Sequence, residues 1–185
     1  MEKIIENSAK GYVHVYTGPG KGKTTAAFGL ALRAVCAGKK VYIGQFIKSM
    51  AYHENRLTDL LEQADDSYGT LTIELLGRGC FIHKNPAPED VEMAKQALER
   101  CAKLLREGTY DVVILDELNV ALYFGLVSLE KVLKAVTERA SDVEVVITGR
   151  RAPNELIAVA DLVTDMQEVK HYYTQGVLSR PGIDR

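Results

Sequence analysis

The chain has 185 residues, with 23 Lys and Arg against 25 Asp and Glu, so its formal net charge is −2. That length suits one domain spanning residues 1–185, and 46% apolar with 26% charged residues is typical of a globular protein rather than a disordered one. The balanced charge argues against nucleic-acid binding, and the longest apolar run falls far short of the ~20 residues of a membrane span.

Short β-branched runs alternate with longer helix-forming segments, which is typical of βαβ units around a parallel sheet. In chain order the pattern predicts a strand at 13–16, a helix at 23–37, strands at 41–46 and 71–76, a helix at 88–107, a strand at 112–115, a helix at 128–140, a strand at 143–148, a helix at 154–160 and a strand at 162–166. Residues 77–88, rich in glycine and proline, are predicted as a loop. We therefore expect an α/β fold, a mostly parallel sheet with helices on both faces.

The most informative segment is residues 17–25, Thr-Gly-Pro-Gly-Lys-Gly-Lys-Thr-Thr, between the first strand and the first helix. Its glycines let successive backbone N–H groups converge on an anion, and the helix adds its positive dipole end. Lys23 supplies a cation for phosphate oxygens, and the Thr24 hydroxyl is suited to a phosphate-bound Mg²⁺. The segment predicts a P-loop, although Thr17 replaces the glycine that usually opens this motif.

The strand at 112–115 is almost purely apolar and is followed by Asp116 and Glu117. An apolar strand that ends in acids is typical of the metal-binding partner of a P-loop. Asp116 is expected to approach Mg²⁺ directly or through water, and Glu117 to bind the metal or activate a nucleophile. Together the two motifs predict binding of a Mg²⁺–nucleoside triphosphate and leave the reaction open.

The three cysteines, Cys36, Cys80 and Cys101, are too scattered for a disulfide framework. The first residues lack the apolar core of a signal peptide. We therefore expect a cytoplasmic protein with reduced thiols.

Further strings narrow the choice of reaction. They are Gly44-Gln45-Phe46-Ile47-Lys48, Asp116-Glu117-Leu118-Asn119, Ile147-Thr148-Gly149-Arg150, Val169-Lys170-His171 and Pro181-Gly182-Ile183. Together with the Gly-x-Gly-Lys-Gly-Lys-Thr-Thr loop, they resemble the P-loop ATP:corrinoid adenosyltransferases, the cob(I)yrinic acid a,c-diamide adenosyltransferases. The resemblance runs over residues 12–183 and includes the unusual glycine spacing.

The resemblance implies a RecA-like P-loop fold and a transferase that moves the 5′-deoxyadenosyl group of ATP to the Co(I) centre of cob(I)alamin or a related corrinoid, with release of triphosphate. It implies Mg²⁺ as the cofactor, with Mn²⁺ as an alternative, and a nucleotide that lies reversed in the P-loop. It also implies a homodimer and a reductase or flavodoxin-type electron donor.

The implied roles fall on a small set of residues. Lys23 and Glu117 are the expected catalytic residues, and Thr24, Asp116 and Glu117 the expected metal ligands. The expected substrate-binding residues are Gly18, Pro19, Gly20, Lys21, Gly22, Lys23, Thr24, Thr25, Phe81 and Arg150. Phe81, between Cys80 and Ile82, falls where some members carry an aromatic pair beneath the corrin, and packing for loop stability is an equal alternative.

Two other functions remain open from the residues alone. A P-loop nucleoside kinase or ATPase would use Glu117 as base or to position water, and would leave ADP. A nucleotide-dependent switch or corrinoid-delivery module would bind ATP without forming a cobalt–carbon bond.

Overall fold

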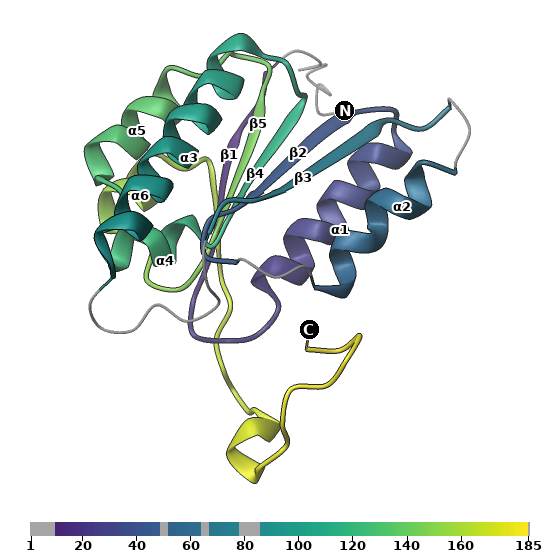
Figure 1. Cartoon of the computed structure of the whole chain (residues 1–185), viewed down its shortest axis with the longest axis vertical. Coiled ribbons are helices and arrows are strands. Elements are labelled where there is room, and N and C mark those ends of the chain that lie inside the picture. Colours follow the sequence, from purple (N-terminus) through teal and green to yellow (C-terminus); the bar gives the residue numbers. More distant parts are fainter. Residues whose placement is uncertain (1–9, 49–51, 64–66, 78–85, 185) are drawn as a thin grey trace, which may run out of the picture.

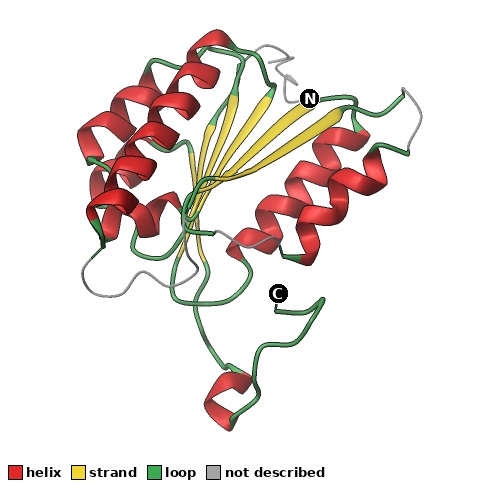
Figure 2. Cartoon of the chain, viewed as in Figure 1, coloured by secondary structure: helices red, strands yellow, loops and turns green. Residues whose placement is uncertain are grey.

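The structure of the protein is a computed structural model, which describes residues 10–48, 52–63, 67–77 and 86–184. At its centre lies a sheet of six strands, all parallel, with helices on both faces (Figures 1 and 2). The strands are β1 (Val13–Thr17), β2 (Lys40–Gln45), β3 (Thr70–Leu75), β4 (Val112–Asp116), β5 (Glu144–Thr148) and β6 (Leu162–Asp165). The six predicted strands are confirmed, with ends that differ by at most one residue.

The order of strands across the sheet is β3-β2-β4-β5-β1-β6. Strand β5 therefore lies between β1, which leads into the P-loop, and β4, which ends in Asp116. The parallel sheet with helices on both faces confirms the predicted α/β fold class. All strands point the same way, so their carboxyl ends, where parallel sheets bind ligands, meet at one edge.

Helices cover the two faces of the sheet unequally (Figure 1). Helices α1 (Lys23–Cys36) and α2 (Leu57–Leu61) lie on one face, and α3 (Pro88–Glu107), α4 (Leu118–Tyr123), α5 (Leu129–Thr137) and α6 (Asn154–Val159) lie on the other. Two short 3₁₀ helices, η1 (His53–Arg56) and η2 (Tyr172–Gln175), complete the described elements.

The two longer helices of the second face begin with local signals in the sequence. Pro88 opens α3, and the Asp90 carboxylate accepts a hydrogen bond from the Ala87 N–H at 3.0 Å. Gly108 ends that helix in the left-handed region, at φ 62°. The Ser128 hydroxyl accepts a hydrogen bond from the Lys131 N–H at the start of α5. These signals explain why both helices were predictable from sequence.

Two apolar clusters hold the layers together. One joins the sheet to α3, α4 and α5, and the other joins it to α1. Every residue of β4 is buried, because helices cover it on both faces. The end of β4, with Asp116, is thereby fixed in the middle of the sheet.

Sequence reasoning missed α4, the η1–α2 segment and η2. Helix α4 has only six residues, too few for a helical periodicity, and it follows Glu117, whose φ is 60°. The stretch after β2 is mostly polar, and the helical spacing of Leu57, Leu60 and Leu61 extends over little more than one turn. The turn at residues 52–55 is held by the hydrogen bonds from the Tyr52 N–H to Asn55 and from Asn55 to the buried Gln45. The C-terminal tail (residues 169–184), which contains η2, folds under the carboxyl edge of the sheet (Figure 1).

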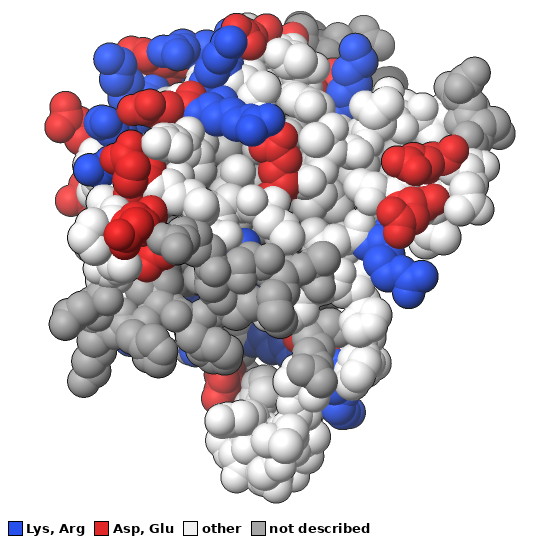
Figure 3. All heavy atoms as spheres, in the orientation of Figure 1, with Lys and Arg blue, Asp and Glu red and all other residues white. Residues whose placement is uncertain are grey.

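The charged side chains on the face drawn in Figure 3 are mixed in sign. The ion pairs of α3 and α5 include Lys103 with Glu107 and Lys134 with Glu138. Among the described residues, no helix is both long and apolar enough to cross a membrane.

Candidate nucleotide site

The glycines of the P-loop are required by close contacts and by backbone conformation. Gly18 and Gly22 have φ values of +98° and +116°, which other residues rarely adopt. A Cβ on Gly18 would overlap the Asp165 side chain, and one on Gly20 would lie 2.6 Å from the Met166 carbonyl oxygen. The Gly20 N–H donates to that same carbonyl at 2.7 Å. The P-loop is therefore shaped against the chain that follows β6.

Lys23 lies at the first turn of α1 with its ammonium group turned onto the loop. Its Nζ donates to the Gly18 carbonyl at 2.9 Å and to the Gly20 carbonyl at 2.5 Å. Burial lowers the pKa of Lys23, and the positive charge of Arg150 lowers it further, while Glu117 opposes the shift. An ammonium group has three N–H donors, so one remains for an oxygen in the cavity.

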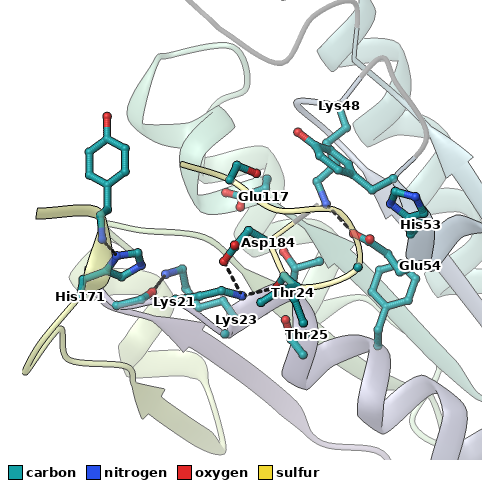
Figure 4. Close-up of a pocket in the computed structure, with 18 of the residues that line it drawn as sticks. Lys21, Lys23, Thr24, Thr25, Lys48, His53, Glu54, Glu117, His171 and Asp184 are labelled. Carbon is teal, nitrogen blue, oxygen red and sulfur yellow. Dashed lines mark hydrogen bonds and ion pairs between the residues drawn. The ribbon is translucent and has the colours of Figure 1, made fainter. Parts of the chain in front are cut away.

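Lys21 contacts the C-terminal tail rather than its own loop. Its Nζ donates to the Ile183 carbonyl at 2.8 Å and lies 3.6 Å from the Asp184 carboxylate (Figure 4). Asp184 also accepts hydrogen bonds from the Tyr172 hydroxyl and from Arg180. The tail therefore closes over the P-loop through one carboxylate and one carbonyl.

Asp116 joins the P-loop to three other parts of the sheet edge. Its Oδ1 accepts from the Thr24 hydroxyl at 2.8 Å and from the Thr148 hydroxyl at 2.7 Å. Its Oδ2 accepts from the Gln45 amide at 2.9 Å and lies 3.2 Å from the Lys48 ammonium. Both carboxylate oxygens thus have two partners each, and the side chain is fully buried. Because Thr24 donates its proton to Asp116, the lone pairs of its oxygen are left for another ligand.

Glu117 is the acid that faces the cavity. It adopts the left-handed region, with φ 60° and ψ 20°, which is uncommon outside glycine. Its N–H donates to the Thr148 hydroxyl at 3.0 Å, which fixes the turn after β4. Burial and the neighbouring Asp116 raise the pKa of Glu117, while Lys48, Lys23 and Arg150 oppose the rise. A cation in the cavity would therefore stabilise the ionised form of this carboxylate.

A cavity of about 680 Å³ lies between these elements (Figure 4). This volume is in the range of small-molecule sites. Lys21 and Lys23 lie on one side, Lys48, His53 and Glu54 on the other, and Glu117 between them (Figure 4). The lining residues are Gly20–Thr25, Phe28, Lys48, Tyr52–Glu54, Glu117, Val120, Arg150, His171–Tyr173, Val177, Ser179 and Gly182–Asp184.

The structure brings most of the predicted residues to this cavity. Lys21, Lys23, Thr24, Glu117 and Arg150 line it. Asp116 lies behind it, under Thr24, and does not line it. Gly18 does not line it either, and contributes through the loop conformation that its φ of +98° allows. Phe81 lies outside the described residues, as do its neighbours Cys80 and Ile82.

Sequence reasoning assigned no role to the wall formed by Lys48 and residues 52–54, or to the tail. Lys48 and the tail fall in strings that carried the family resemblance, so the signal was present but not tied to the cavity. Asn119, another residue of those strings, is fully buried and donates to the Gly149 carbonyl at 3.0 Å. It supports the turn after β5 rather than the cavity.

Among the described residues, no group of three or more His, Cys, Asp or Glu side chains is placed to hold a metal ion. A site that binds a metal with Thr24 and Glu117 alone would leave most coordination positions to other oxygens. Mg²⁺ suits such a site, since it commonly binds one or two carboxylates together with phosphates and water. The donor set therefore fits Mg²⁺ better than a metal that needs a full protein cage.

Comparison with known proteins gives a consistent result. The family model described as ATP:corrinoid adenosyltransferase BtuR/CobO/CobP matches residues 9–184. A corrinoid adenosyltransferase of Sinorhizobium is 35% identical, over 99% of this chain and 85% of its own length. A corrinoid adenosyltransferase of Escherichia coli K12 is also 35% identical, over 95% of this chain and 86% of its own length. The corrinoid adenosyltransferase CobA of Salmonella typhimurium LT2 is 34% identical, over 95% of this chain and 86% of its own length.

Proposed function

The chain belongs to the ATP:corrinoid adenosyltransferase family, and we propose that the cavity between its P-loop and its C-terminal tail holds ATP for this reaction. The protein is a transferase that moves the 5′-deoxyadenosyl group of ATP to the Co(I) centre of a corrinoid and releases triphosphate. The observation that supports the placement is that Lys23 and Thr24 of the P-loop and Glu117 of the acidic strand end line one cavity.

The electron balance of the reaction sets the task of these residues. The electron pair of Co(I) forms the cobalt–carbon bond at C5′, and the pair of the C5′–O bond leaves with the triphosphate. The nucleophile carries no proton, so the protein needs no general base. Its contribution is to position the two substrates and to stabilise the charge that grows on the triphosphate. We assign this role to Lys23, Lys21 and the backbone N–H groups of the P-loop, apart from Pro19, which has none, and Gly20, which donates to the Met166 carbonyl.

We place the triphosphate in the P-loop with its γ-phosphate innermost, the reverse of the orientation in kinases. A kinase must expose the γ-phosphorus to its acceptor. This reaction must instead expose C5′ and bury the leaving group. Arg150, which lines the cavity and lowers the pKa of Lys23, adds positive charge for either substrate.

The proposed metal is Mg²⁺, with Mn²⁺ as an alternative, held by Thr24 and Glu117. When bound, the metal neutralises part of the triphosphate charge. Asp116 orients the Thr24 hydroxyl so that its oxygen faces the cavity, and Thr148 orients Asp116 in turn. The raised pKa of Glu117 favours this assignment, because a cation would relieve the cost of its buried charge.

The remaining assignments extend beyond the nucleotide site. We place Phe81 against the corrin, and we expect a cytoplasmic homodimer that acts on cob(I)alamin or a related corrinoid. A reductase or flavodoxin-type protein is the expected electron donor. The family resemblance supports these assignments.

The decisive experiment is anaerobic incubation of the protein with cob(I)alamin and Mg²⁺–ATP. We expect the visible spectrum to change to that of an adenosylated corrinoid, with one triphosphate released per cobalt–carbon bond. The Lys23→Ala variant is the matched control. Release of ADP would indicate a kinase or ATPase instead. Binding of ATP with no spectral change would indicate a switch or delivery module.

A further inference from the structure

Gln45 connects the buried acid of the site to a distant wall of the cavity. It is the last residue of β2, paired in register with Asp116 of β4, and its side chain is fully buried. Its Nε2 donates to Asp116 Oδ2 at 2.9 Å, and its Oε1 accepts from Asn55 Nδ2 at 2.9 Å. Asn55 Oδ1 in turn accepts from the Tyr52 N–H at 2.9 Å. These three hydrogen bonds form an unbroken chain, the Gln45–Asn55 relay.

The direction of the relay is fixed at both ends. The ionised Asp116 carboxylate only accepts hydrogen bonds, and the Tyr52 N–H only donates. Each amide between them has one donating and one accepting end. Turning either amide over would place two acceptors or two donors face to face. The sequence Tyr52 to Asn55 to Gln45 to Asp116 therefore has one arrangement that satisfies every group.

The far end of the relay carries residues that line the cavity. Tyr52 and Glu54 both line it, on the side opposite the P-loop lysines. Lys48 adds a second link to the same wall. Its ammonium group lies 3.2 Å from Asp116, 3.4 Å from Glu54 and over the Tyr52 ring at 4.8 Å. The wall and the Thr24–Asp116 pair are thereby held as one unit.

We propose that Gln45 and Asn55 are positioning residues for adenosyl transfer. They hold the cavity wall at residues 52–54 in a fixed position relative to the Thr24–Asp116 pair. The inference rests on the proposed function, because that function puts the triphosphate and the metal at Thr24 and Glu117. The three hydrogen bonds of the relay join Tyr52, Asn55, Gln45 and Asp116, and none of the three is made to the P-loop backbone or to Lys23. Its loss should therefore misplace the reacting groups while the phosphates stay bound.

The test uses Asn55→Asp, which keeps the shape and the acceptor for Tyr52 but removes the donor to Gln45. The control is Gln63→Glu, the same change from amide to acid on an exposed side chain in the turn that follows α2. Both variants and the wild type are assayed anaerobically with preformed cob(I)alamin. The rates are divided by the number of ATP-binding sites measured by calorimetry, so that unfolded protein does not lower the kcat.

We expect N55D to lower kcat by about 10- to 100-fold, the range seen when a supporting residue behind a metal site is lost. Its KM for ATP should stay within about threefold of wild type, and Q63E should change neither constant by more than about twofold. If N55D fails to fold, Asn55→Ala takes its place with the same expectation.

A kcat per binding site within threefold of wild type would overturn the inference. So would a KM for ATP that rises as much as kcat falls, since that would indicate general loosening of the site. Failure of the wild type itself to adenosylate cob(I)alamin would instead refute the proposed function.

Discussion

Thr148 offers the sharpest test of how the sheet edge holds the site. Its hydroxyl donates to Asp116 Oδ1 at 2.7 Å and accepts from the Glu117 N–H at 3.0 Å, and the residue is fully buried. Thr148→Val replaces the hydroxyl with a methyl group of almost the same shape. The change therefore removes both hydrogen bonds without opening a cavity.

The expected cost follows from these two bonds. A hydrogen bond to a charged group contributes about 1.5–3 kcal/mol, and a buried N–H left without an acceptor costs about 1–3 kcal/mol. T148V should therefore lower the free energy of unfolding by about 3–5 kcal/mol. For a chain of this size, that corresponds to a fall in Tm of about 10 °C. Thr148→Ser keeps the hydroxyl and loses one methyl group, at a cost of about 1 kcal/mol.

The assay is thermal and urea unfolding of wild type, T148V and T148S without nucleotide, followed by adenosyl transfer under saturating ATP. T148S should retain most of its stability and activity. T148V should lose stability and activity, because the Thr148 hydroxyl no longer joins the Glu117 N–H to the Asp116 carboxylate. Equal stability of the Val and Ser variants would refute the reasoning, since the two hydrogen bonds of the hydroxyl would then contribute no more than the methyl group.

Three further predictions concern the charged groups of the cavity. Lys23→Ala should lower kcat by about 100-fold or more while Tm falls by no more than about 4 °C; near-normal turnover would remove Lys23 from the mechanism. Burial raises the pKa of Glu117 above its ordinary 4.5, so ionisation of this group costs stability as pH rises beyond that value. Glu117→Gln should therefore raise the Tm of the nucleotide-free protein at pH 7, lose that advantage below about pH 4.5, and lose metal-dependent activity; an unchanged Tm at pH 7 would contradict the buried charge. Asp184→Asn should lower the KM for ATP about two- to fivefold at low salt, because Lys21 loses a competing carboxylate, and the gain should shrink at high salt. A KM that rises would show that Asp184 assists ATP binding.

Local patterns predicted most of the fold but only part of the site. The P-loop and the acidic end of β4 were found because each is a continuous string with its own chemistry. The hydroxyl of Thr148 lies against Asp116 only because β5 is inserted beside β4, and no local pattern encodes that order. The turn at Tyr52 was missed for a similar reason, since its hydrogen bonds reach Gln45 through Asn55.

The C-terminal tail was hardest to place from sequence. Its residues are mostly exposed, so it has no apolar periodicity that would predict its path. Its position over the P-loop depends on a few polar contacts, such as that between Lys21 and Ile183. Contacts of this kind follow from the finished fold and leave little trace in local composition.

The position of β1 has a consequence for the order in which the chain folds during synthesis. Val13 pairs with Val145, and His14 pairs with Leu162, so the first strand made has both of its partners near the other end of the chain. Strands β2, β3 and β4 are neighbours and can pair earlier. Such distant pairing is slow, and it leaves a strand edge open to aggregation until synthesis has passed β6. Because the P-loop takes its shape from Met166, the proposed ATP site is complete only once the residues after β6 are in place, and we expect ATP binding by a ribosome-bound chain to report completion of the sheet.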